Sequence, residues 1–140
     1  MDNQKLKVII AEDEFLIAMD IKRKLEELGF DVTSLTTTAL ETITKAELDK
    51  PNIIFMDVRL SGSLNGIEAV KIISYRSKVP IIFLIDDSEE KIFHQANLDI
   101  SFELLSKPVS LNNLSKALKN IILKSDLFVN NIAQPPSITF

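Results

Sequence analysis

Residues 53–57, with the sequence IIFMD, constrain the fold of this chain most strongly. Four apolar residues stand in a row, with Pro51-Asn52 before them and the glycine-containing segment 61–66 after them. A short apolar run between turn formers is typical of a strand that is buried on both faces, as in a parallel sheet. Asp57 ends the run, so we expect its carboxylate at the edge where the sheet opens to solvent.

Two other strand-like runs also end in charged residues. Residues 6–11 are followed by Glu12-Asp13, and residues 100–106 are followed by Lys107-Pro108. If these strands and the strand 53–57 are parallel neighbours, three carboxylates and one ammonium group meet at one edge of the sheet. The strands 30–35 and 81–85 complete the predicted set.

Segments with helical periodicity separate these strands. Helices are predicted to begin at Glu14, after the threonine run 36–38, at Asn65-Gly66, at Asp87 and after Ser110. Gly29 ends the first helix, because glycine readily takes the left-handed conformation of a helix end. Asp87 and Glu90 form a predicted capping box for the fourth helix, which continues to about Asn97. Inward positions are expected to include Leu40 and Leu111, and Phe15, Phe30, Phe55, Phe83, Phe93 and Phe102 are expected mainly in the core or in packing contacts.

Five alternations of strand and helix predict a parallel sheet with helices on both faces. Right-handed crossovers leave few arrangements, and we predict a flavodoxin-like, doubly wound five-stranded parallel sheet of order 2-1-3-4-5 with five helices. Strands one and three are neighbours in this order. Glu12, Asp13 and Asp57 should therefore crowd together, and Lys107 should reach them from the fifth strand.

Length and composition limit the number of domains and the kinds of molecule that the chain is expected to bind. The 140 residues suffice for one domain, which we place at 1–125, with 126–140 a loosely ordered tail or linker that contains Pro135-Pro136. The net charge is −4 and no basic stripe stands out, which argues against direct nucleic-acid binding. The chain has no cysteine, and its one histidine, His94, cannot build a metal centre and is expected to face solvent. No membrane span or signal segment is predicted, so a cytoplasmic location is expected.

The predicted cluster contains the chemical groups that phosphoryl transfer requires. Three close carboxylates repel one another unless a cation neutralises them, and oxygen ligands alone favour Mg²⁺. A nearby lysine is suited to a phosphoryl oxygen. With Mg²⁺ and Lys107 beside it, Asp57 can act as a nucleophile toward phosphorus.

The sequence resembles the receiver domain of two-component response regulators over about residues 5–125. The resemblance rests on Glu12-Asp13, Asp57, the helix start Gly66-Ile67-Glu68 and Lys107-Pro108, in that order and spacing. Each motif is weak alone, and their combination is strong.

The resemblance implies a phosphoprotein in signal transduction. Asp57 would accept a phosphoryl group from a histidine kinase or a phosphotransfer protein. Asp13, Asp57 and the backbone carbonyl of Arg59 would hold Mg²⁺, with Glu12 acting directly or through water. Lys107 would pair with Asp57 and then with the phosphate, and the peptide bond after Lys107 is typically cis in such domains. The protein would not be an enzyme, beyond catalysing its own phosphoryl transfer and hydrolysis.

Three positions depart from the family pattern. Ile85 stands where the family usually has Thr or Ser, Leu104 replaces the usual aromatic switch residue, and Asp86 replaces a small residue. Isoleucine cannot donate a hydrogen bond to the phosphoryl group. Arg59 and Asp87 fall at variable positions that control water access, and we hypothesise an ion pair between them across the mouth of the site.

Three functions remain open at this point. The first is a phosphorylation-dependent switch that alters binding of an unknown downstream protein through helix four, strand five and helix five. The second is a pseudo-receiver, an interaction module that phosphorylation does not control. The third is a flavodoxin-like cofactor enzyme, which the acidic segment Glu12-Asp13-Glu14 disfavours because it would repel a flavin phosphate. A monomer or weak dimer is expected.

Overall fold

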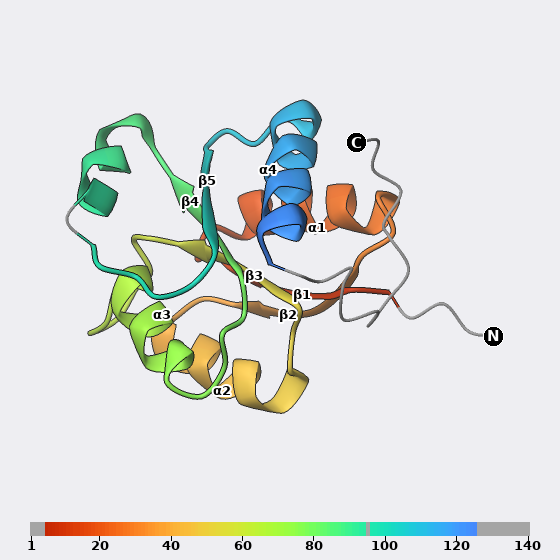
Figure 1. Ribbon diagram of the computed structural model, residues 1–140. Helices are drawn as coiled ribbons and strands as arrows, with labels where there is room; N and C mark the ends of the chain where they lie inside the picture. Colours follow the sequence, from red (N-terminus) through yellow and green to blue (C-terminus); the bar gives the residue numbers. More distant parts are fainter. Residues whose placement is uncertain (1–4, 95, 126–140) are drawn as a thin grey trace.

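The computed structural model describes residues 5–94 and 96–125, and its centre is a parallel sheet in the order β2-β1-β3-β4-β5 (Figure 1). The five strands are β1 (Lys7–Ala11), β2 (Asp31–Thr36), β3 (Ile53–Asp57), β4 (Ile81–Ile85) and β5 (Phe102–Ser106). The predicted strand order is confirmed. The predicted tail, 126–140, lies outside the described residues.

Five helices cover the two faces of this sheet. They are α1 (Phe15–Glu27), α2 (Ala39–Asp49), α3 (Gly66–Ser74), the 3-10 helix η1 (Asp87–His94) and α4 (Leu111–Lys124). Helices α1 and α4 lie on one face, and α2 and α3 lie on the other (Figure 1). In the described part of the chain, each helix is too short or too polar to cross a bilayer.

Strand β3 is buried on both faces because each face of the sheet has its own hydrophobic core. Ile53 and Phe55 pack in the cluster under α1 and α4, whereas Ile54 and Met56 pack in the cluster under α2 and α3. Successive side chains of a strand point to opposite faces, so a strand between two cores needs apolar residues at every position. Asp57 continues this strand and is only 3% exposed.

Local sequence signals fix several element ends as predicted. Gly29 has a φ of +98° and follows the C-cap residue of α1. The side chain of Thr38 accepts a hydrogen bond from the N–H of Glu41 at the start of α2. Ser110 accepts one from the N–H of Asn113, at 3.1 Å, at the start of α4. Each hydroxyl satisfies a backbone donor that the first helical turn leaves unpaired.

The fourth helix differs from its prediction in form and in capping. It is a 3-10 helix that ends at His94, and the capping contact involves Asp86 and Glu89 instead of Asp87 and Glu90. The Oε1 atom of Glu89 accepts the N–H of Asp86 at 2.8 Å. Ile92 of this segment is 43% exposed, so η1 lacks the broad apolar face that stabilises a longer α-helix.

Three apolar residues that were predicted to face inward are exposed. Phe15 is 68% exposed, Leu40 61% and Leu111 46%. Each lies in the first turn of its helix, at the carboxyl edge of the sheet, where the helical pattern continues past the strands that would cover it. The sequence period is therefore right, but these positions have no sheet beneath them.

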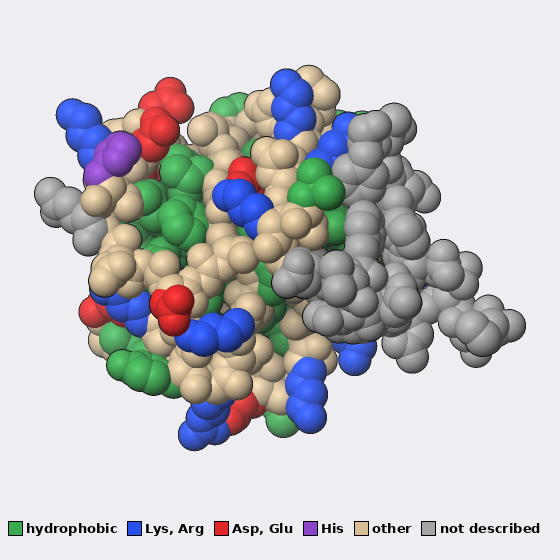
Figure 2. Space-filling view, viewed as in Figure 1, with side chains coloured by type: hydrophobic (Ala, Val, Ile, Leu, Met, Phe, Trp, Pro, Cys, Tyr) green, Lys and Arg blue, Asp and Glu red, His purple; other side chains and the backbone are tan. Residues whose placement is uncertain are grey.

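An aromatic cluster joins η1 to the edge of the sheet. The rings of Phe83 and Phe93 lie 4.8 Å apart, and Phe102 lies 5.9 Å and 5.8 Å from them. Hydrophobic side chains also gather between η1 and β5 on the face shown in Figure 2. The rings anchor η1 to β4 and β5.

Helix α3 begins in close contact with β3. Asn65 and Glu68 form a reciprocal capping box, with both hydrogen bonds at 2.9 Å. Between them Gly66 lies against the backbone of Asp57, and a Cβ atom at this position would overlap the Asp57 carbonyl oxygen and lie 2.9 Å from the Cγ of Met56. Only glycine allows the helix to start this close to the strand.

We expect Gly66→Ala to lower the free energy of unfolding by about 1–3 kcal/mol, because the added methyl group must push Asp57 and its strand away from the helix. Urea denaturation measures the loss. Ser63→Ala, at an exposed position of the same loop, is the matched control and should leave stability nearly unchanged. If Gly66→Ala had the same free energy of unfolding as the wild type, the close approach of α3 to β3 would not be required for stability.

Candidate functional site

The predicted acidic residues meet at the carboxyl edge of the sheet. Glu12 and Asp13 directly follow β1, and Asp57 is the last residue of β3. The two strands pair in parallel with Ala11 opposite Met56, which brings Glu12 beside Asp57. One carboxylate oxygen from each of Glu12, Asp13 and Asp57 lies within 4.8 Å of the others.

Lys107 brings the positive charge to this cluster. Its Nζ lies 3.2 Å from Oε1 of Glu12 and 3.3 Å from Oδ2 of Asp57. The backbone N–H of Lys107 donates to the carbonyl of Ile85 at 2.8 Å, which ties the end of β5 to β4. The Lys107–Pro108 peptide bond is cis. Burial lowers the pKa of Lys107, but the carboxylates of Asp57 and Glu12 outweigh it and raise the pKa overall.

The pKa of Glu12 is strongly raised in this cluster. The residue is 2% exposed, and burial, with a further contribution from the charge of Asp57, raises its pKa from 4.5 to about 7. The N–H of Glu14, which donates to Oε2 of Glu12 at 3.1 Å, and the ammonium of Lys107 lower the pKa without cancelling the rise. Burial is thus the main reason that the Glu12 carboxyl favours its protonated form, and the ammonium of Lys107 does not fully offset it.

Two further contacts orient the acidic groups. The hydroxyl of Ser61 donates to Oδ2 of Asp13 at 2.7 Å, and the N–H of Arg59 donates to Oδ1 of Asp57 at 3.0 Å. Ser61 also forms an isolated parallel bridge with Thr38. Sequence analysis missed Ser61, since a serine in a loop of this composition carries no distinguishing signal.

The three unusual residues have distinct surroundings. Ile85 is 3% exposed and packs in the core on the α2 and α3 side, and Leu104 is half-buried against the same core. Asp86 accepts the hydroxyl of Ser88 at 2.8 Å, and this bond lowers the pKa of Asp86. The extra carboxylate is thus held by its own loop.

The predicted partner of Arg59 was wrong. The Nε of Arg59 contacts Oε2 of Glu89 instead of Asp87, which is exposed. Glu89 is 2% exposed because its side chain turns inward to cap Asp86. The contact is an ion pair without an aligned hydrogen bond, since Oε2 has no hydrogen-bond partner in the described part of the protein. Spacing alone pointed to the neighbouring acid, and the inward turn of Glu89 decides the pairing.

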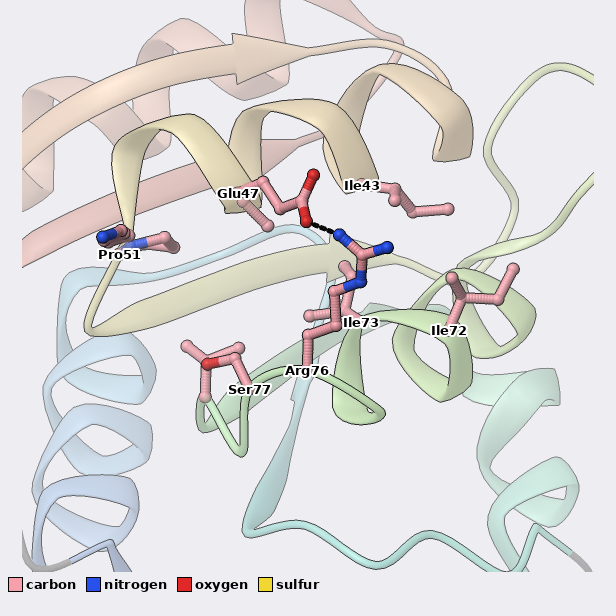
Figure 3. A pocket seen from close by; sticks show the side chains of 10 residues that line it. Ile43, Glu47, Pro51, Ile72, Ile73, Arg76 and Ser77 are labelled. Carbon is pink, nitrogen blue, oxygen red and sulfur yellow. Dashed lines mark ion pairs between the residues drawn. The ribbon is translucent and has the colours of Figure 1, made fainter.

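A hollow of about 460 Å³ lies between α2 and α3, far from this chemistry. Its lining includes Pro51 and Val79, which precede β3 and β4, so it lies at the opposite edge of the sheet from the carboxylates. An ion pair between Glu47 and Arg76 spans it (Figure 3). None of the charged residues predicted to act together lines this hollow.

Known proteins share both the sequence and the fold of this chain. The family described as response regulator receiver domain matches residues 8–119. The transcriptional regulatory protein PdtaR of Mycobacterium tuberculosis is 33% identical over 113 residues, which cover 81% of this chain and 55% of that protein. The phyllosphere-induced regulator PhyR of Methylorubrum extorquens is 31% identical over 117 residues, which cover 83% of this chain and 43% of that protein. The chain thus spans about half the length of these curated relatives.

Among solved structures, the signal receiver domain of a modulated diguanylate cyclase from Desulfovibrio desulfuricans superposes with a TM-score of 0.79. The two sequences are 30% identical, and the match covers 89% of this chain and 99% of that one. Fold, site geometry and sequence therefore agree that this chain belongs to the response regulator receiver domain family.

Proposed function

We propose that this chain is the phosphoacceptor receiver domain of a two-component phosphorelay. Asp57 would take a phosphoryl group from a phosphohistidine of a histidine kinase or phosphotransfer protein, and the product would bind a downstream protein differently. The observation that carries this proposal is the meeting of Asp57 with two further carboxylates and the ammonium of Lys107 at one point.

The donor set fits Mg²⁺. Its side-chain ligands would be oxygens of Asp13, Asp57 and Glu12, directly or through water, and the backbone carbonyl of Arg59 would complete the set. Mg²⁺ prefers such oxygen ligands. The raised pKa of Glu12 is consistent with the assignment, because a cation would stabilise the charged form of a buried carboxylate that lies beside a second one.

The reaction follows from the positions of Asp57 and Lys107. An oxygen of the Asp57 carboxylate forms a bond to phosphorus while the phosphorus–nitrogen bond of the phosphohistidine breaks, and a donor ring already protonated on its other nitrogen leaves as neutral imidazole. Lys107, 3.3 Å from Asp57, is placed to pair with a phosphoryl oxygen as charge moves onto it. When bound, Mg²⁺ would supply positive charge that offsets the charge of both the donor phosphate and the attacking oxygen. Hydrolysis later returns the Asp57 carboxylate and inorganic phosphate, so the domain acts on nothing but its own phosphoryl group.

The pseudo-receiver is the second candidate, and Ile85 and Leu104 favour it. Without a hydroxyl on Ile85, the phosphoryl group loses a hydrogen bond worth about 1.5–3 kcal/mol for a charged acceptor. The complete acidic cluster and Lys107 favour the phosphoacceptor, since a module that only binds a partner has no need for a buried Glu12 with a raised pKa.

Exposed apolar side chains beside the site support docking of a partner protein. Phe15, Leu16 and Leu111 are 68%, 82% and 46% exposed at the starts of α1 and α4, at the same edge as Asp57. We propose that the downstream protein binds the face formed by η1, β5 and α4.

The net charge of −4 bears on other partners. We propose that this chain binds neither nucleic acid nor membranes directly. We also propose a cytoplasmic location and a monomer or weak dimer.

One prediction of this proposal concerns the pH dependence of stability. Glu12 has a pKa of about 7 in the folded protein, against 4.5 ordinarily, so the folded state holds a proton that the unfolded state has lost between these values. Stability from this group is therefore present below about pH 4.5 and is lost as the pH rises toward 7. We expect the urea midpoint of Glu12→Gln, without Mg²⁺, to fall less between pH 5 and pH 8 than that of the wild type.

Glu26→Gln, at an exposed position of α1, is the matched control and should keep the wild-type pH profile. Mg²⁺ should stabilise the wild type at pH 8 more than Glu12→Gln, because the variant loses a ligand charge. Identical pH profiles for Glu12→Gln and the wild type would contradict the electrostatic role given to Glu12.

Another prediction tests phosphorylation itself. With Mg²⁺ and acetyl phosphate, the intact mass of the protein should increase by one phosphoryl group, and chelation of Mg²⁺ should prevent the increase. Asp57→Asn should remain unlabelled, because its amide is not a nucleophile. Asp87→Asn, with an exposed side chain after β4, should still be labelled. No mass change and no binding of beryllofluoride by the wild type would favour the pseudo-receiver.

A further inference from the structure

The phosphoryl group would lack a donor at the end of β4. Ile85 closes this strand with an apolar side chain that is 3% exposed. Lys107 supplies one cationic donor to the Asp57 side of the site. A phosphoryl group has three oxygens and about two negative charges, so even with Lys107 and a bound Mg²⁺ each serving one oxygen, it would lack the donor that a hydroxyl at Ile85 would supply.

Arg59 is the nearest candidate for that donor. Its backbone N–H is bonded to Oδ1 of Asp57 at 3.0 Å, which fixes this residue at the rim of the site. Its side chain is 68% exposed, and in the described ranges only Glu89 forms an ion pair with its guanidinium. Guanidinium has five N–H donors in a planar fork that suits phosphate oxygens. The Nε contact with Glu89 therefore leaves most of these donors available.

The carboxylate of Glu89 occupies, at the rim of the site, a position between donors that could also bind a phosphoryl group. One carboxylate oxygen accepts the N–H of Asp86, the first residue after β4, and the other contacts Arg59 in the loop after β3. Strands β3 and β4 are neighbours, with Asp57 opposite Leu84, so these two donors come from adjacent strand ends. Glu89 is 2% exposed, and its Oε2 has no hydrogen bond among the described residues. Arg59 is therefore the main counter-charge of a buried carboxylate, and its departure obliges Glu89 to change its protonation or its position.

We propose that Arg59 binds the phosphoryl group on Asp57 in place of the missing hydroxyl, and that Glu89 holds Arg59 until that group arrives. The proposal rests on Asp57 being the phosphoacceptor. A dianionic phosphoryl group competes with the single charge of Glu89 for the same guanidinium. Arg59 then leaves Glu89 and adds its N–H donors to those of Lys107.

The exchange links the site to η1. Once Arg59 leaves, the buried carboxylate of Glu89 has lost its counter-charge, and it turns toward solvent or takes up a proton. Glu89 lies in η1, which also carries Phe93, packed against Phe83 and Phe102. A change at Glu89 thus loosens the segment that forms one border of the face between η1 and β5. This route needs neither a hydroxyl at Ile85 nor an aromatic ring at Leu104.

Beryllofluoride with Mg²⁺ is the probe, because it mimics the phosphoryl group on an aspartate without turnover. We expect Arg59→Ala to weaken beryllofluoride binding about tenfold or more, as for loss of a charge-assisted hydrogen bond. We expect Glu89→Gln to tighten it several-fold, since the competing charge is gone while an oxygen remains for the N–H of Asp86. In the double variant the gain from Glu89→Gln should vanish, because it acts only through Arg59. Arg59→Lys should recover part of the affinity.

Hydrogen exchange of the peptide 86–94 reports the movement of η1. In the wild type its exchange should become faster when beryllofluoride binds, and this increase should be absent in Arg59→Ala. Arg76→Ala and Glu47→Gln break a second arginine–glutamate pair, between α2 and α3, and are the matched controls for loss of charge. They should bind the probe as the wild type does. Urea denaturation checks that each variant is folded, and Mg²⁺ affinity without beryllofluoride checks that the metal ligands are undisturbed.

The outcomes separate this inference from the proposed function. Opposite effects of Arg59→Ala and Glu89→Gln, with the gain lost in the double variant, support the exchange. Equal affinities in all variants, or a similar loss in both single variants, would overturn it and leave the phosphoacceptor function standing. A wild type that binds no beryllofluoride and takes no phosphoryl group would overturn both.

Discussion

The site depends on the pairing of β1 with β3. Both strands are buried between two hydrophobic cores, so their register cannot shift without moving apolar side chains to the wrong face. That register places Glu12 beside Asp57 even though the two carboxylates repel each other. The free energy of burying the strands thus holds together like charges that would separate in solution. Burial, with a smaller contribution from the charge of Asp57, raises the pKa of Glu12 as a result.

Positive charge enters this cluster from two loops that are themselves fixed to the sheet. Lys107 is tied through its backbone to the carbonyl of Ile85, and Arg59 is tied through its backbone to the carboxylate of Asp57. The side chain of Lys107 points to the carboxylates, whereas that of Arg59 reaches out to Glu89. Among the residues that the structure describes, Lys107 is thus committed to the acidic cluster, and Arg59 lies close by but is paired with Glu89.

The sequence predicts structural features that depend on residues close together in the chain or on the burial of whole strands. The apolar run before Asp57 indicated a central strand, Gly29 and Ser110 marked helix ends, and the resulting order placed the charged strand ends together. The sequence does not show where the sheet stops beneath a helix, so Phe15 and Leu40 were expected inside. The pairing of Arg59 with Glu89 depends on the inward turn of one side chain, which spacing along the chain does not reveal.

The balance of charge explains why such a second cation is useful. Apart from Asp86, whose carboxylate accepts a hydroxyl of its own loop, the site has, among the described residues, four carboxylates and two cations, Lys107 and Arg59. A divalent ion would balance Glu12, Asp13, Asp57 and Glu89 if all were ionised. Phosphorylation replaces the single charge of the Asp57 carboxylate by about two on the phosphoryl group. The site then carries one negative charge too many. Moving Glu89 into solvent while Arg59 stays removes one negative charge and restores the balance. Breaking the ion pair between Arg59 and Glu89 would therefore compensate the charge that phosphorylation adds.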